Sequence, residues 1–227
     1  MKNYFPYLLL VTLFLLTSCS STPEAVIVMA PAPDTPVVMV PTRDTLNSEH
    51  PPISGYGAYG YVIFTKRPID NPTSNANEFC EAYRAGLEPS SSFPSIQKSH
   101  IMPTFWLLKS DSNNSCKSLV KNYDYAKAKL IASAIKKLDV AGPILVAWTL
   151  PFEEAKGLDA LVLDLSEIQT EQYSEVIGTW SSRITRSPDM WSDGFNIEKI
   201  RIALKSFLNK NGDSIVSVIE WFKETAS

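Results

Sequence analysis

The stretch Tyr59-Gly60-Tyr61-Val62-Ile63-Phe64-Thr65 is made almost entirely of aromatic and β-branched residues. This composition favours a β-strand. Ile144–Leu150 is a continuous apolar run, which is typical of a strand that is buried on both faces. Ile101–Leu108 and Ala160–Leu165 complete the set of predicted strands, although Pro103 either places the former at a sheet edge or delays its start.

Helical periodicity fills the segments between these strands and most of the C-terminal third. Asp124 is a good N-cap, so the helix predicted around it can instead begin at Tyr125. Ser166-Glu167-Ile168-Gln169 has the form of a capping box, which marks the start of another helix. The predicted helices are Asn77–Leu87, Cys116–Leu138, Gln169–Ile184, Ile197–Asn209 and Ser214–Thr225.

Strands that alternate with helices predict an α/β fold with a small, partly parallel sheet, flanking helices and a helical C-terminal third. The strand that follows Pro151 can alternatively form a hairpin with its predecessor, which would make the sheet mixed. We expect one such globular domain over residues 53–227.

The N-terminus has the features of an export signal. Lys2 is followed by the apolar run Tyr7–Leu16, which is about half the length of roughly 20 residues that a membrane-spanning helix needs. The next residues complete Leu16-Thr17-Ser18-Cys19, which resembles the lipobox of bacterial lipoproteins. An ordinary cleaved signal or an uncleaved anchor are the alternatives.

The resemblance to bacterial lipoproteins implies a particular maturation. Residues 1–18 would be removed as a signal peptide, a diacylglyceryl group would be attached to the thiol of Cys19, and the new amino terminus would be acylated, for example with palmitate. Ser20, rather than aspartate, follows the cysteine, which in this family implies transport to the outer membrane. Two or more acyl chains give stable anchoring, and we expect the domain to lie in the periplasm.

Residues 19–52 contain seven of the sixteen prolines and read as an extended tether between the lipid and the domain. Within this segment, Val26–Pro31 and Val37–Pro41 are similar valine-rich runs. An alternative interpretation is that these runs are short strands that pair with a sheet edge of this protein or of a partner.

Cys80 and Cys116 are the two cysteines that remain beside Cys19. In an exported protein an even pair predicts a disulfide, with two free thiols as the alternative. Two histidines offer little for zinc, and we expect no metal site.

Charge and motifs argue against several functions. The formal charge is −3 and becomes −4 when the segment that holds Lys2 is removed, whereas a nucleic-acid-binding domain would carry a basic stripe. Gly55-Tyr56-Gly57-Ala58-Tyr59-Gly60 matches G-x-G-x-x-G, but it precedes a strand and opens no helix, so we expect no nucleotide or other cofactor. His50 and His100 have no nucleophile motif beside them, so the sequence favours binding over catalysis.

Polar residues follow the predicted strands. Asp164 ends one strand, and ligands of open α/β sheets bind at such ends. If all strands were parallel, a crevice for a small anion or sugar would gather there. Alternatively, strand ends are simply polar and Asp164 caps the next helix. The candidate crevice residues are Lys66, Arg67, Lys109, Asp111, Thr149 and Asp164.

The C-terminal third is rich in aromatic residues, and Trp180, Ile184, Phe207 and Trp221 are expected in the core. Trp191 lies in the polar loop Ser187–Gly194 and is a candidate for contact with a partner, since tryptophan often carries interface energy. Burial in the core is the alternative for Trp191.

These observations lead to two hypotheses. In the first, a lipid-anchored outer-membrane protein binds another envelope component, most simply a protein. In the second, the domain is a periplasmic enzyme or a saccharide- or anion-binding module that uses the strand-end crevice.

Overall fold

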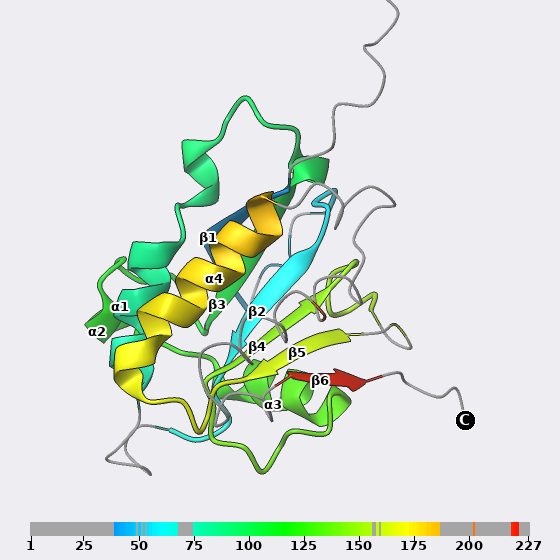
Figure 1. Ribbon diagram of the computed structural model, residues 1–227. Helices are drawn as coiled ribbons and strands as arrows, with labels where there is room; N and C mark the ends of the chain where they lie inside the picture. Colours follow the sequence, from blue (N-terminus) through cyan, green and yellow to red (C-terminus); the bar gives the residue numbers. More distant parts are fainter. Residues whose placement is uncertain are drawn as a thin grey trace, which may run out of the picture. The chain divides into compact units, whose positions relative to one another are not determined.

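The computed structural model describes residues 39–48, 50, 52, 54–67, 75–155, 158, 160–186, 202 and 219–222. Within them, six strands form one sheet in the order β1-β3-β2-β4-β5-β6 (Figure 1). The strands are β1 (Val40–Asn47), β2 (Tyr59–Ile63), β3 (Ile101–Leu108), β4 (Ile144–Trp148), β5 (Ala160–Asp164) and β6 (Ile219–Phe222).

The sheet is mixed, and the predicted α/β class is confirmed. β1 and β2 both run parallel to β3, which lies between them. β4 is antiparallel to β2, β5 to β4, and β6 to β5. The connection from β2 to β3 passes through a helix, as a parallel pair requires, whereas β4 and β5 are joined by a loop. The hairpin alternative for the strand after Pro151 is therefore the correct one.

β3 is an internal strand with every residue buried, so the prediction that Pro103 makes it an edge or a late strand is wrong. Proline has no N–H to donate to a sheet. β2 pairs with β3 only from Thr104 to Trp106, and Pro103 lies just before this ladder begins.

β1 lies inside the range that the sequence assigned to the tether, so the folded domain begins before residue 53. Its register starts with Val40 opposite Ile101, and Leu46 is buried in the core. Val40 and Pro41 come from the second valine-rich run, which supports the edge-pairing interpretation for that run; the first run lies outside the described residues. Pro41 is tolerated because β1 is an edge strand, where a missing N–H need not leave a gap in the ladder.

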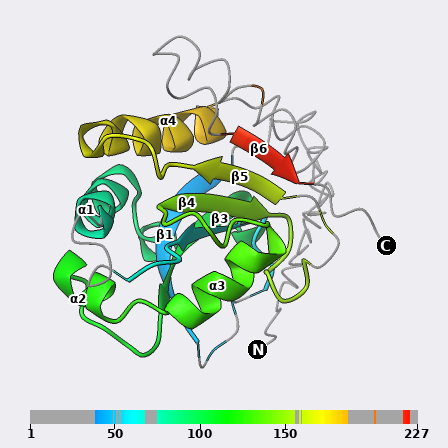
Figure 2. The same ribbon diagram turned by 90° about the horizontal axis from the view of Figure 1, so that it is seen from below.

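Helices cover both faces of the sheet. α1 (Ala76–Gly86) and α4 (Tyr173–Arg186) lie on one face, with α2 (Cys116–Lys121) beside α1, and α3 (Tyr125–Ala134) lies on the other face (Figure 2). Short 3-10 turns at Ser90–Ser92, Lys98–His100 and Thr170–Gln172 connect these elements.

The helix predicted over Cys116–Leu138 is two helices, and the alternative start at Tyr125 is confirmed. The side chain of Asp124 accepts hydrogen bonds from the backbone N–H groups of Ala126 and Lys127, each at 3.0 Å. The backbone N–H of Asp124 bonds to the carbonyl of Leu107 at 3.0 Å. The chain leaves the helical path here because it bonds to the end of β3.

Two predicted helices near the C-terminus differ in the structure. The segment Ile219–Phe222 is a strand that pairs with β5, because pairing with an open strand edge outweighs the weak helical preference of the sequence. α4 begins at Tyr173, after the predicted capping box, because the Ser166 hydroxyl bonds to Asp164 instead. The predicted helix Ile197–Asn209 lies, apart from residue 202, outside the described residues.

The glycine-rich turn leads directly into β2, as its position in the sequence predicts. Gly55 has a φ of +92°, a backbone conformation that glycine adopts without strain. A Cβ at Gly57 would lie 2.3 Å from the carbonyl oxygen of Ser99, so only glycine fits this close approach.

A cluster of aromatic rings forms the core where β2 and β3 end. Phe64 contacts Trp106 and Tyr123, with ring centroids 5.7 and 5.4 Å apart. The hydroxyl of Tyr123 donates to the carbonyl of Val62 at 2.7 Å and accepts from the N–H of Phe64 at 3.0 Å. The core is therefore bonded to the backbone of β2 as well as packed against it.

The sulfur atoms of Cys80 in α1 and Cys116 in α2 are 2.08 Å apart, at disulfide distance. Both side chains are buried. The pair joins two helices that are separated by the whole of β3.

We expect replacement of both Cys80 and Cys116 by serine to lower the free energy of unfolding by up to about 4 kcal/mol, because the bridge closes a loop with a sequence separation of 36 residues. Urea unfolding of the oxidised protein and of the double variant measures the difference. Reductant should lower the unfolding midpoint of the wild type and leave that of the double variant unchanged; equal midpoints for both oxidised proteins would contradict the prediction.

Candidate functional site

The six predicted crevice residues do not all meet. Lys66 and Arg67 follow β2, and Lys109 and Asp111 follow β3. Because β2 and β3 are parallel, all four residues lie at the C-terminal ends of these strands. Thr149 follows β4, which is antiparallel, and its neighbour Trp148 pairs with the first residue of β2. Thr149 therefore lies at the opposite end of the strands, beside the start of β2, and its assignment to the crevice is wrong.

Asp164 lies at the same end of the strands as Lys66, because its partner Ile144 also pairs with the last residue of β2. Its carboxylate accepts from the backbone N–H and the hydroxyl of Ser166, at 3.0 and 2.7 Å, and lies 3.3 Å from the ammonium of Lys137. Both partners of this ion pair are 14% exposed. Asp164 is thus engaged in joining the segments before β4 and after β5.

Lys66 and Arg67 line a basic hollow of about 300 Å³ beside α3. Arg67 lies over the ring of Tyr125, with its guanidinium carbon 6.0 Å from the ring centroid. Lys129 supplies a third positive charge from the next turn of α3. We call this hollow, with Thr65 and Ala126 completing its lining, the basic hollow. The sequence predicted two of its cations and missed the third, since only the fold brings α3 beside the end of β2.

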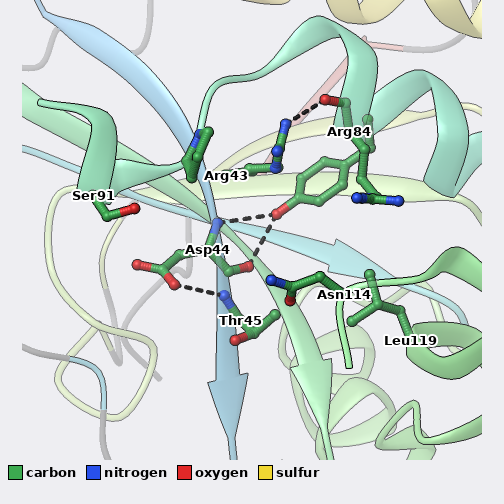
Figure 3. Close-up of a pocket in the computed structure, with 9 residues that line it drawn as sticks. Arg43, Asp44, Thr45, Arg84, Ser91, Asn114 and Leu119 are labelled. Atoms are coloured by element: carbon green, nitrogen blue, oxygen red, sulfur yellow. Dashed lines mark hydrogen bonds between the residues drawn. The ribbon is translucent and has the colours of Figure 1, made fainter. Parts of the chain in front are cut away.

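A second hollow, of about 270 Å³, lies at the β1 edge of the sheet (Figure 3). We call it the edge hollow. It is formed by β1, the end of α1, the loop that follows α1 and the segment around α2. Its lining residues are Arg43, Asp44, Thr45, Tyr83, Arg84, Pro89, Ser91, Asn114 and Leu119. Sequence patterns do not indicate this hollow, because β1 lies within the segment that is predicted to be a tether.

Tyr83 connects α1 to the seam between β1 and β3. Its buried hydroxyl lies 2.6 Å from the carbonyl oxygen of Thr104. It also lies 3.0 Å from the carbonyl oxygen of Asp44 and accepts from the N–H of Asp44 at 3.1 Å, and Figure 3 draws these two bonds. Burial raises the pKa of this phenol well above its usual value. Tyr83 therefore stays neutral and acts as a hydrogen-bonding link between three elements.

Arg43 closes the outer edge of β1. Its guanidinium donates to the carbonyls of Arg84 and Leu87 at the end of α1, and its backbone N–H donates to the carbonyl of Glu88 at 2.8 Å. An open strand edge invites pairing with other chains. Covering it with the loop after α1 removes this liability at the middle of β1.

Asp44 is the acidic group of the edge hollow. Burial raises the pKa of its carboxyl above the usual value, and hydrogen bonds from Thr45 and Ser90 act in the opposite direction. The N–H of Thr45 donates to this carboxylate at 2.8 Å. The polar atoms at the floor of the hollow are therefore largely used within the fold.

The two hollows offer hydrogen bonds and charge to a ligand. Among the residues that line them there is no histidine or cysteine. Across the described part of the chain, no group of three or more His, Cys, Asp or Glu residues is placed to hold a metal ion. Trp191, the predicted partner contact, lies outside the described residues, whereas Trp180 is fully buried as expected.

Comparison with models of protein families, with curated proteins and with solved structures gives no significant match. No helix in the described ranges is both long enough and apolar enough to cross a membrane.

We expect Tyr83→Phe to lower the free energy of unfolding by about 1–3 kcal/mol, because it leaves buried backbone groups at the β1–β3 seam without a partner. Chemical denaturation measures the change. Tyr56→Phe is a matched control, since Tyr56 is only half-buried, and it should shift stability by less than about 0.5 kcal/mol. Equal effects of the two substitutions would contradict the role given to Tyr83.

We expect Asp44→Asn to stabilise the protein at neutral pH. The folded-state pKa of Asp44 is raised, so folding disfavours the ionised carboxyl. This penalty grows as pH rises from the unfolded-state pKa to the folded-state pKa and is absent below both. The amide oxygen of asparagine can still accept from Thr45. Unfolding midpoints measured at neutral pH and below pH 3.8 should show an advantage of Asp44→Asn only at the higher pH; an advantage that is equal at both would contradict it.

Proposed function

We propose that this chain is an outer-membrane lipoprotein, lipidated at Cys19, whose α/β domain binds another component of the bacterial envelope, most simply a protein. The observation that carries the proposal is the sequence Leu16-Thr17-Ser18-Cys19 at the end of a short apolar run. Acyl chains on this cysteine would hold the protein at a membrane surface without a spanning helix.

The cysteines of the domain support the route of export. The sulfurs of Cys80 and Cys116 are at disulfide distance, and disulfides form and persist in oxidising compartments such as the periplasm. A cytosolic protein would keep such a pair reduced.

The segment between the proposed lipid anchor and the domain is long enough for the domain to reach partners away from the membrane. β1 begins at Val40, so residues 20–39 separate the domain from Cys19. A chain of this length can extend to at most roughly 70 Å. The domain is thus free to meet components at some distance from the membrane that holds its lipid.

The geometry favours the binding of a partner over the strand-end crevice. Thr149 lies at the opposite end of the strands from Lys66. Asp164 already forms an ion pair with Lys137 and accepts a hydrogen bond from Ser166. The crevice hypothesis needs Asp164 and Lys66 in one cleft, but the basic hollow is lined by Lys66 without Asp164. What remains is a set of exposed cations, which suits a macromolecular surface.

We expect Cys19→Ala to release the protein from the membrane fraction or to leave it unprocessed, because the thiol that would take the lipid is gone. Sucrose-gradient fractionation of bacterial cells and mass spectrometry of the N-terminal peptide measure this. Ser20→Asp is the matched control: it keeps the thiol, and by the lipoprotein resemblance it should move the protein to the inner membrane. A Cys19→Ala protein with unchanged mass shift and outer-membrane location would overturn the proposal.

A further inference from the structure

α3 carries a strip of apolar residues on its outward side as well as an apolar buried side. Ala126, Leu130 and Ala134 are spaced by four residues, so they share one face of the helix, and all three are exposed. Leu130 is 64% exposed. α3 lies on its face of the sheet apart from α1 and α4 (Figure 2). The opposite side of the helix faces the core through Tyr125, Ala128, Ile131 and Ala132. The exposed residues of α3 also include Lys129 and Ser133, so the apolar strip has a positive charge beside it.

The basic hollow borders this outward face. Lys66, Arg67 and Lys129 are exposed, and in the described part of the chain none of the three forms an ion pair. Lys127, two residues before Lys129 in α3, differs because its ammonium is 2.9 Å from the carboxylate of Glu153. Three positive charges therefore converge beside an exposed leucine in a protein whose overall charge is negative.

The donors that usually hold a small phosphate are already in use. The first N–H groups of α3, those of Ala126 and Lys127, donate to Asp124, although such amides are what an anion binds at a helix start. The hydroxyl of Thr65 donates to the carbonyl of Val140. What is left for a ligand is long, solvent-exposed cationic side chains and an apolar face. These features suit an extended acidic chain better than a compact anion.

Within the domain, this area lies far along the strands from the point where the chain enters β1. β1 starts at Val40 opposite Ile101, whereas Val62, near the end of β2, pairs with Trp106. β1 and β2 are both parallel to β3. The chain therefore enters the domain at the N-terminal end of these three strands, and the basic hollow lies at their C-terminal end.

We infer that this area, which we call the α3 surface, binds an acidic segment of a protein partner. The α3 surface consists of Lys66, Arg67, Lys129, Ala126, Leu130 and Ala134. Carboxylates of the partner pair with the three cations, and an apolar side chain of the partner covers Leu130. Arg67 rests over the ring of Tyr125 within this chain, which holds its guanidinium beside the other two cations. The inference names the chemistry of the partner and rests on the proposed function only for its location in the envelope.

The test uses the full chain, solubilised in detergent, and a fluorescent synthetic peptide rich in glutamate with two leucines. We expect anisotropy to show saturable binding that weakens with added salt. The triple variant Lys66→Gln, Arg67→Gln, Lys129→Gln should weaken binding about tenfold. Leu130→Ser should weaken it as well, which a purely electrostatic attraction would not do.

The control is the triple variant Lys98→Gln, Lys117→Gln, Lys121→Gln, which removes the same charge from exposed lysines on other elements. It should bind the peptide like the wild type. Equal loss in both triple variants, or no binding to the wild type, would overturn the inference. So would binding of inorganic phosphate or of phosphatidylglycerol vesicles with the same dependence on Lys66, Arg67 and Lys129, because the site would then serve a small anion or a lipid.

Circular dichroism and urea unfolding of each variant separate loss of binding from loss of fold, and the substituted side chains are all exposed. The outcome is independent of the anchor. If Cys19→Ala left localisation unchanged while the peptide bound as expected, the lipid proposal would fail and the α3 surface would stand. The reverse result would remove the α3 surface and leave the lipid proposal intact.

Discussion

Burial of both faces of β3 is the constraint on which the rest of the structure depends. β3 lies between two parallel strands, and all of its residues are buried. Parallel neighbours require a crossover through a helix, and both faces of such strands must be covered. α1 therefore packs over Trp106, and α3 covers the opposite face of the β2–β3 region. The edge hollow lies at the C-terminal end of α1, and the basic hollow lies at the N-terminal end of α3.

Tyrosine hydroxyls carry the links between layers. From α1, the hydroxyl of Tyr83 forms hydrogen bonds at the β1–β3 seam. The hydroxyl of Tyr123 bonds to the carbonyl of Val62 and to the N–H of Phe64 at the end of β2. A hydroxyl buried without a partner would be costly, so each of these bonds specifies one arrangement of helix on sheet. Their pKa values are raised by burial, and the links therefore persist in neutral form. The fold depends on specific polar bonds as well as on apolar area.

The two hollows show different uses of charge. In the edge hollow, the charged groups of Arg43 and Asp44 are held by hydrogen bonds with the backbone around them. In the basic hollow, the cations extend into solvent beside an exposed apolar face. Charges that the fold does not use are the ones that can be offered to a partner. The basic hollow beside α3 is therefore the one whose charges are accessible to a partner.

The sequence defines most of the local elements, because periodicity and capping act over a few residues. It located β2, β3, β4 and β5, it offered the cap at Asp124, and it paired Cys80 with Cys116. The folded structure sets the direction of β4, which places Thr149 at the opposite end of the strands from Lys66, and it makes strands of residues 40–47 and 219–222. It also decided that Lys129 lies beside Arg67. Strand direction and edge pairing depend on backbone hydrogen bonds between distant segments, and such bonds leave little trace in the identity of the side chains.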